Sequence, residues 1–224
     1  MGKTRRRKGG VIIDKGGNSI ILYPPPKCKN KSNLEDYVGK ITLTRSGKSL
    51  PEIDPKLLRI LKKIDPDQKY LYYPEKCDVD DETIEENKEY NLKKDNIEIV
   101  RKGKDKWFDW KHRKDWKVPS EDKLEHLKKA IYLLHDNKIV HGDFSGANVI
   151  YGKDDMPRII DFTEAVYESP KDYIDQEKEF IERAWPKLDL YAMYRRNTKE
   201  GKKIDAERTK YKNKLLKTRR KIIA

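Results

Sequence analysis

The chain has 224 residues, of which 41% are charged and 35% hydrophobic, and its formal net charge is +13. This length suits one domain or two small lobes, and the lack of an internal period argues against a solenoid. No apolar run approaches the roughly 18 residues that span a bilayer, and the N-terminus lacks the apolar core of a signal peptide. The positive charge favours polyanionic partners such as nucleotides, nucleic acid or acidic protein surfaces. Lys and Glu side chains that only solvate the surface explain the charge equally well.

The two cysteines, Cys28 and Cys77, have no metal-type spacing and are too few for a disulfide framework. A reducing, intracellular compartment is therefore the expectation. The core must be economical, and thirteen Tyr, four Trp and four Phe supply large rings for it.

The first half of the chain predicts an arm, a hairpin, a strand and a helix. Residues 1–10 are basic and Gly-bearing, which indicates a flexible arm. The segment VIIDKGGNSIILYPPP predicts a hairpin around a Gly-Gly turn, ending at the triple proline. DYVGKITLT (36–44) predicts a strand that contains Lys40. LPEIDPKLLRILKKID (50–65) has apolar residues at near-helical spacing, with Pro55 suited to the first turn.

Further strands and helices are predicted along the rest of the chain. KYLYYPEKC (69–77) and NIEIVRKG (96–103) predict strands, separated by an acidic loop at 78–89. Ser120 is predicted to cap a helix whose apolar positions repeat at three or four residues, namely Leu124, Leu127, Ile131 and Leu134. Residues 171–196 predict one or two helices broken at Pro186, and the basic residues after 195 predict a solvated helical tail with little core of its own.

Residues 139–166, IVHGDFSGANVIYGKDDMPRIIDFTEAV, contain the side chains best suited to chemistry. Asp143, Asn148 and Asp161 fall at strand ends or in loops, where a sheet edge can present them to a ligand. An Asp in a loop can accept or orient a hydroxyl proton, while an Asn carbonyl and a second carboxylate are hard oxygen ligands for Mg²⁺. Phosphoryl transfer needs this set, because the enzyme mainly positions reactants and neutralises charge on phosphate oxygens.

This stretch resembles the protein-kinase-like superfamily. The catalytic loop of that family reads His-Arg-Asp with Asn five residues after the Asp, and Asp-Phe-Gly follows further on. This chain has His141-Gly142-Asp143, then Asn148, then Asp161-Phe162-Thr163. The resemblance implies that Asp143 is the catalytic base or hydroxyl-orienting residue, that Asn148 and Asp161 hold the metal, and that ATP and Mg²⁺ are the cofactors. His141 is interpreted as a residue that braces the loop.

Three departures from the family pattern are informative. Gly142 replaces the usual Arg, Ser145 stands where serine/threonine kinases place a Lys, and Thr163 replaces the Gly after Asp-Phe. These features resemble the atypical branches, which include the RIO kinases, the small kinase of the KEOPS complex, and the aminoglycoside and choline phosphotransferases. Without that Arg the loop cannot clamp a phosphorylated activation segment, so constitutive competence or control by a partner is expected.

The N-terminal half matches the kinase pattern less closely. Gly16 and Gly17 fit the hairpin over the nucleotide phosphates, Lys40 fits the phosphate-binding lysine, and Glu52 fits its ionic partner. Abundant Lys, the frequency of paired Gly in turns and the preference of Glu for helix N-termini explain the same residues without a nucleotide. With YVGKI and KKIDPDQKYLYYPEKC, these segments resemble the divergent kinases of large DNA viruses. DLYAMY (189–194) resembles the helix that supports the catalytic loop, with Asp189 as the candidate.

Together these patterns predict an α+β, bilobal protein-kinase-like fold with a small antiparallel-sheet N-lobe and a reduced, mainly helical C-lobe. The predicted parts are an arm (1–10), the N-lobe (11–103), the C-lobe (104–196) and a basic tail (197–224). The predicted activity is ATP- and Mg²⁺-dependent transfer to a protein Ser or Thr hydroxyl. The alternatives are a small-molecule phosphotransferase and a pseudokinase scaffold.

The expected partners are a protein substrate and a nucleic acid or acidic partner that binds the basic tail, with no membrane. The expected location is the cytoplasm, in a virus-infected host cell or a virion.

Overall fold

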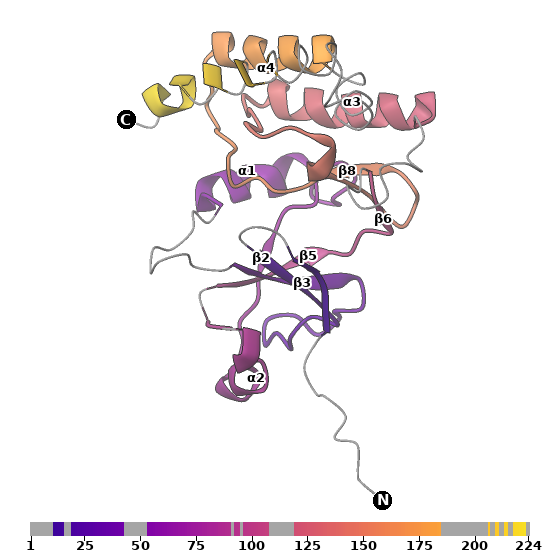
Figure 1. Cartoon of the computed structure of the whole chain (residues 1–224), viewed down its shortest axis with the longest axis vertical. Helices are drawn as coiled ribbons and strands as arrows, with labels where there is room; N and C mark the ends of the chain where they lie inside the picture. The colour runs from indigo at the N-terminus through magenta and orange to yellow at the C-terminus, as the bar shows by residue number, and fades with distance from the viewer. Residues whose placement is uncertain are drawn as a thin grey trace, which may run out of the picture. The chain divides into compact units, whose positions relative to one another are not determined.

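A computed structural model describes residues 11–15, 19–42, 53–90, 92–94, 96–107 and 119–184, together with 206, 209–210, 213–214 and 217–222. The chain divides into two compact units, Met1–Glu52 with Tyr73–Lys102 and Ile53–Tyr72 with Gly103–Ala224. The structure is α+β, with antiparallel sheets and a set of helices (Figure 1). A boundary falls between Lys102 and Gly103, at the predicted end of the N-lobe. The segment 53–72, predicted in the N-lobe, packs instead in the second unit.

The first unit contains a five-stranded sheet in the order β1-β2-β3-β5-β4, with every neighbouring pair antiparallel. Its strands are β1 (Val11–Lys15), β2 (Ser19–Tyr23), β3 (Tyr37–Thr42), β4 (Glu75–Lys76) and β5 (Ile97–Arg101). The β1–β2 pair has a register shift between Ile12 and Asp14, which is a β-bulge. The two strands of the predicted hairpin and the strands predicted within 36–44 and 96–103 are thereby confirmed.

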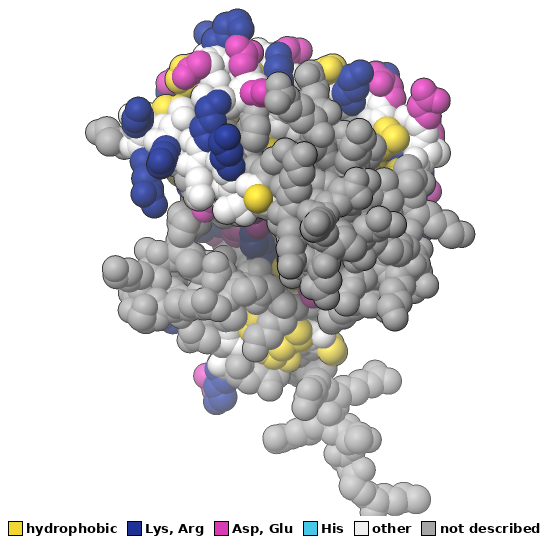
Figure 2. Space-filling model, turned by 45° about the horizontal axis from the view of Figure 1, so that its top comes forward, with side chains coloured by type: hydrophobic (Ala, Val, Ile, Leu, Met, Phe, Trp, Pro, Cys, Tyr) yellow, Lys and Arg dark blue, Asp and Glu magenta, His cyan; other side chains and the backbone are white. Residues whose placement is uncertain are grey.

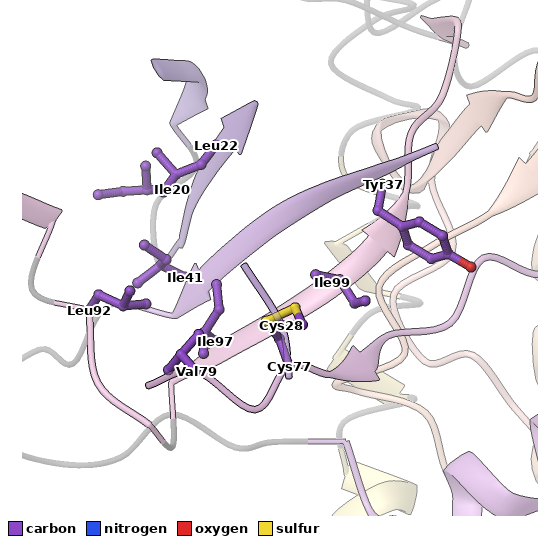
Figure 3. Close-up of a cluster of buried hydrophobic side chains, with 10 residues drawn as sticks. All are labelled: Ile20, Leu22, Cys28, Tyr37, Ile41, Cys77, Val79, Leu92, Ile97 and Ile99. Atoms are coloured by element: carbon purple, nitrogen blue, oxygen red, sulfur yellow. A yellow bond between two sulfur atoms is a disulfide. The ribbon is translucent and has the colours of Figure 1, made fainter. Parts of the chain in front are cut away.

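One face of this sheet is covered by a compact apolar core (Figure 3). Alternating residues of β2, β3 and β5 point into it, as expected for strands with one buried face. The core contains Ile20, Leu22, Tyr37, Ile41, Val79, Leu92, Ile97 and Ile99 with the two cysteines. Cys28 and Cys77 form a disulfide with Cα atoms 5.1 Å apart. Two cysteines are too few for a disulfide framework, but the fold brings these two, 49 positions apart, into one core where they form a single bond.

Two predictions for the segment between residues 69 and 90 are wrong. The aromatic segment forms only the two-residue strand β4 and an isolated bridge at Leu71, because its buried rings pack without a continuous ladder. The acidic stretch after it is helical, with α2 at Asp81–Glu86 and the 3-10 turn η1 at Lys88–Tyr90. The Asp80 side chain accepts a hydrogen bond from the Thr83 backbone N–H at 2.8 Å, so it caps this short helix.

The second unit contains three longer helices: α1 (Pro55–Ile64), α3 (Glu121–Asp136) and α4 (Lys171–Ala184). Pro55 occupies the first turn of α1, as predicted, and Asp54 caps it by accepting from the Lys56 backbone N–H at 2.7 Å. Ser120 stands at the N-cap of α3, but its side chain makes no capping hydrogen bond. Its hydroxyl bonds the Asp122 carboxylate and lowers the pKa of that group.

A three-stranded antiparallel sheet, in the order β6-β7-β8, lies within the same unit. It consists of β6 (Asp105–Lys106), β7 (Val149–Tyr151) and β8 (Pro157–Ile159), with the 3-10 turn η2 (Gly146–Asn148) directly before β7. Leu71 pairs in parallel with Ile159 beside this sheet. Because β7 and β8 are antiparallel, the segment before β7 and the segment after β8 lie at the same end of this strand pair.

Charge of both signs is spread over the surface. Figure 2 shows Lys and Arg side chains interspersed with Asp and Glu on one face. Exposed ion pairs such as Lys104–Asp155 and Lys171–Asp175 contribute to this pattern, and such pairs add little stability. Within the described part of the chain, no helix combines the length and the apolar character needed to cross a membrane.

Candidate active site

The loop between α3 and β7 is organised around the buried ring of His141. Its Nε2 lies 3.0 Å from the Ile160 carbonyl oxygen, and its Nδ1 accepts a hydrogen bond from the Asp143 backbone N–H at 3.4 Å. The ring is 1% exposed and contacts the rings of Phe144 and Phe162. Because Nδ1 accepts, Nε2 must bear the proton that bonds Ile160. His141 therefore braces the loop, as predicted, and both ring nitrogens are already engaged.

Asp143 and Asn148 are held together at the start of β7. The η2 turn brings Asn148 back toward Asp143, and the Asn148 amide nitrogen donates to the Asp143 backbone carbonyl at 2.8 Å and to its Oδ2 at 3.2 Å. This orients the amide, since the nitrogen faces Asp143 and the carbonyl oxygen Oδ1 faces away from it. The Asn148 Oδ1 atom is then the one that can bind a cation.

Asp161 lies two residues after the end of β8, in a left-handed backbone conformation with φ of 62°. Val149 pairs with Ile159, and the Ile160 N–H donates to the Asn148 carbonyl oxygen at 2.9 Å. Asn148, directly before β7, and Asp161, shortly after β8, therefore lie at the same end of this antiparallel strand pair. The Thr163 hydroxyl donates to Asp161 Oδ1 at 2.8 Å. Thr163 thus fixes the orientation of the Asp161 carboxylate, which a Gly at this position could not do.

Gly142 is required by its surroundings. Its φ of +77° lies in the left-handed region, and a Cβ atom added there would lie 2.5 Å from the Glu164 carbonyl oxygen. No side chain fits in this space without moving the Thr163–Glu164 segment. The replacement of the usual Arg by Gly is therefore matched by close packing of that segment onto the loop.

Glu177 in α4 supports the loop that contains His141 and Gly142. Sequence reasoning missed this residue. Its Oε1 accepts from the Gly142 backbone N–H at 2.8 Å, and its Oε2 accepts from the His141 backbone N–H at 3.0 Å and from the His135 ring at 2.9 Å. Glu177 as a whole residue is 1% exposed, so its carboxylate is buried. Burial, helped by the charge of Glu177, raises the pKa of the neighbouring Tyr173 hydroxyl. Glu177 shares the buried face of α4 with Tyr173 and Ile174, and an acid on such a face is the signal that could have found it.

The chemistry of the edge residues fits a hard divalent cation. Asn148 Oδ1 and the Asp161 carboxylate are oxygen donors, which Mg²⁺ prefers, and Mg²⁺ needs only one or two carboxylates when phosphate oxygens complete its shell. Within the described ranges, no cluster of three or more His, Cys, Asp and Glu side chains is arranged to hold a metal. The candidate ligand set is therefore an amide and a carboxylate, with Asp143 beside them.

The residues predicted to contact the nucleotide lie in the first unit or outside the described residues. Gly16, Gly17 and Glu52 fall outside the described ranges, and so does Asp189. Lys40 lies in β3 directly across from Glu98 in β5, so both side chains project from the sheet face opposite the apolar core. Glu98 thus lies in cross-strand register with Lys40, and the predicted pairing of Lys40 with Glu52 stays a prediction because Glu52 lies outside the described residues.

The loop braced by His141, the paired Asp143 and Asn148, and the Asp161 carboxylate held by Thr163 form one candidate site. Residues 98–184, less than half of the 224-residue chain, match the family described as the RIO domain. A search of curated proteins found no match.

Among solved structures, the chain is similar to a chain in the crystal structure of the yeast RNA Pol II CTD kinase CTDK-1 complex. The identity is 18% and the TM-score 0.43, over 75% of this chain and 49% of that chain. The chain thus spans about half the length of that solved chain.

Proposed function

We propose that this protein transfers the terminal phosphoryl group of ATP, with Mg²⁺, to a Ser or Thr hydroxyl of a protein. The observation that supports this most directly is that the side chains of Asn148 and Asp161 are both held in place at the same end of the β7–β8 pair. Asn148 is held by Asp143, and Asp161 is held by Thr163. Phosphoryl transfer depends mainly on such fixed positioning and on charge neutralisation.

In the proposed reaction each residue has one task. Asp143 orients the acceptor hydroxyl and takes its proton as the bond between the acceptor oxygen and phosphorus forms. The bond between that phosphorus and the oxygen bridging to ADP breaks, and ADP leaves with the electron pair. Asn148 and Asp161 would hold Mg²⁺, and the bound ion would supply charge neutralisation on the phosphate oxygens. Lys40 is proposed to bind the nucleotide phosphates.

The test uses the full chain with radiolabelled ATP, Mg²⁺, and acidic and basic protein acceptors. We expect labelled Ser or Thr in the acceptor or in the chain itself. Asp143→Asn should lower the rate by about 100-fold or more, since general base catalysis contributes about 10² to 10⁴. Asp161→Ala should abolish Mg²⁺-dependent nucleotide binding. Asp136→Asn, an exposed position at the end of α3, is the matched control and should leave both unchanged.

Three other results would replace this proposal. Transfer to small alcohols or aminoglycosides but not to proteins would select a small-molecule phosphotransferase. Nucleotide binding that is the same in Asp161→Ala, with no transfer to any acceptor, would show that the enzyme proposal is wrong. Salt-sensitive binding of RNA or DNA that is lost with residues 195–224, without transfer, would select a scaffold.

A further inference from the structure

The described part of the C-terminal tail does not extend away from its unit. Residues 217–222 are helical, and Ile222 packs against a buried cluster formed by Val140, Val166, Tyr173 and Ile174. The Thr218 hydroxyl lies 3.4 Å from Gln176 Oε1 in α4. Figure 1 shows the yellow C-terminal segments beside α4. The tail is helical here, as predicted, and its last described turn has an apolar contact with a core cluster of the second unit.

Arg219 reaches from this turn to the segment that follows Asp161. Its Nη1 forms an ion pair with Glu164 Oε2, and its Nη2 lies 3.4 Å from the Thr163 carbonyl oxygen. The side chains of Arg219 and Glu164 are 21% and 37% exposed. Burial lowers the pKa of Arg219, yet a guanidinium stays charged at neutral pH. The contact is thus a partly buried, charge-assisted pair with a second bond to the backbone.

The segment that Arg219 holds is in contact with the candidate catalytic groups on its other side. The Thr163 hydroxyl donates to Asp161 Oδ1, and the Glu164 carbonyl oxygen fills the space beside Gly142. Residues 163 and 164 therefore contact Asp161 and Gly142 on one side. On the other side they contact Arg219. Loss of the Arg219 contacts would release the segment that orients Asp161.

We propose that Arg219 is a positioning residue, which the C-terminal tail contributes to hold Thr163 and Glu164 against the catalytic loop and so to set Asp161 for metal binding. The proposal rests on the proposed function of Asp161. It gives a physical role to the combination of Gly142 and a basic tail. The chain has no Arg at position 142 to clamp the following segment, and it has a guanidinium from position 219 on that segment.

The test compares Arg219→Ala with Arg220→Ala in the full chain. The two substitutions remove the same charge from adjacent tail positions, and Arg220 is exposed. We expect Arg219→Ala to raise the Mg²⁺ concentration for half-maximal binding of a fluorescent ATP analogue by about 10-fold, the lower end of the effect of losing a residue that orients a metal ligand. Arg220→Ala should leave it unchanged. Arg219→Lys keeps a positive charge that can pair with Glu164, so this variant should show a smaller loss than Arg219→Ala.

A second measurement needs no nucleotide. Amide hydrogen exchange of residues 163–166 should become about 10-fold faster in Arg219→Ala, because local opening is then easier, and should stay unchanged in Arg220→Ala. If Arg219→Ala and Arg220→Ala behave alike in both measurements, the proposal is wrong. If the wild-type protein shows no Mg²⁺-dependent nucleotide binding, the proposed function fails. In that case the exchange rates alone decide whether Arg219 holds the segment.

Discussion

The carbonyl oxygen of Glu164 occupies the space that a Cβ atom of residue 142 would need, at 2.5 Å from its ideal position. Gly142→Ala should therefore destabilise the protein by about 2–4 kcal/mol, since it adds a left-handed Ala to an overpacked contact. Transfer activity should fall further than stability alone explains, because the substitution pushes the Thr163–Glu164 segment away from Asp161. Urea unfolding and initial rates measured well below the unfolding transition separate the two effects. A variant with wild-type stability and rate would show that this contact is loose.

Glu177 should be essential for an ordered catalytic loop. Glu177→Ala leaves the backbone N–H groups of His141 and Gly142 buried without an acceptor, which costs about 3–5 kcal/mol. Glu177→Gln keeps an acceptor oxygen, so it should cost less and retain partial activity. Asp175→Asn, on the exposed side of the same helix, breaks only the surface pair with Lys171 and should change stability by less than about 0.5 kcal/mol. Equal urea midpoints for Glu177→Ala and Asp175→Asn would contradict this role.

The elements that sequence predicted well are those with a local pattern. The hairpin at 11–23, the helix after Pro55 and the helix after Ser120 follow from apolar periodicity and turn residues, which act over a few positions. The spacing of Asp143, Asn148 and Asp161 along the chain likewise indicates the candidate site. The structure brings Asn148 and Asp161 to the same end of the β7–β8 pair.

What could not be predicted depends on tertiary contacts between distant segments. The Cys28–Cys77 disulfide spans 49 positions, and neither cysteine has a local pattern that identifies its partner. Arg219 meets Glu164 across 55 positions, and among 52 Lys and Arg residues nothing in sequence distinguishes it. Glu177 looked like one acid in a charged helix, and only its contacts with the loop reveal its role.

The disulfide should contribute strongly to the stability of the first unit. Closing a loop of this length restricts the unfolded chain, and such a bond typically contributes about 2–4 kcal/mol. Reductant should therefore lower the urea midpoint of the wild-type protein. The double variant Cys28→Ser with Cys77→Ser should start at that lower midpoint and show no further response to reductant. A thiol assay that finds two reactive thiols in the unfolded, non-reduced protein would show that the bond is not formed.

His126 should make the second unit less stable in mild acid. Burial, with the nearby charge of Arg158, lowers the pKa of this ring from its ordinary value of 6.5. The unfolded chain then binds the proton more readily than the folded chain, so the contribution of His126 is complete above about pH 6.5 and is lost as the pH falls toward the folded pKa. His126→Gln keeps a donor for the Lys69 carbonyl oxygen, which lies 3.1 Å from the ring. The wild-type protein should lose more unfolding free energy than His126→Gln between pH 7.5 and 5.5, and equal losses would contradict the prediction.

Lys138, the residue after the C-cap of helix α3, has a backbone conformation that suits glycine. Its φ is 58°, its backbone N–H donates to the His135 carbonyl oxygen at 3.0 Å, and the Ile139 N–H donates to that of Leu134 at 2.9 Å. This is a Schellman motif with a lysine at the left-handed position. Lys138→Gly should therefore stabilise the protein by about 0.5–1 kcal/mol, because relief of the left-handed strain exceeds the added entropy of the unfolded chain. Lys129→Gly, at an exposed position inside the same helix, should destabilise it by about 1 kcal/mol. Thermal or urea unfolding of both variants measures the difference, and a loss of stability in Lys138→Gly would mean that its side chain makes a contact worth more than the strain.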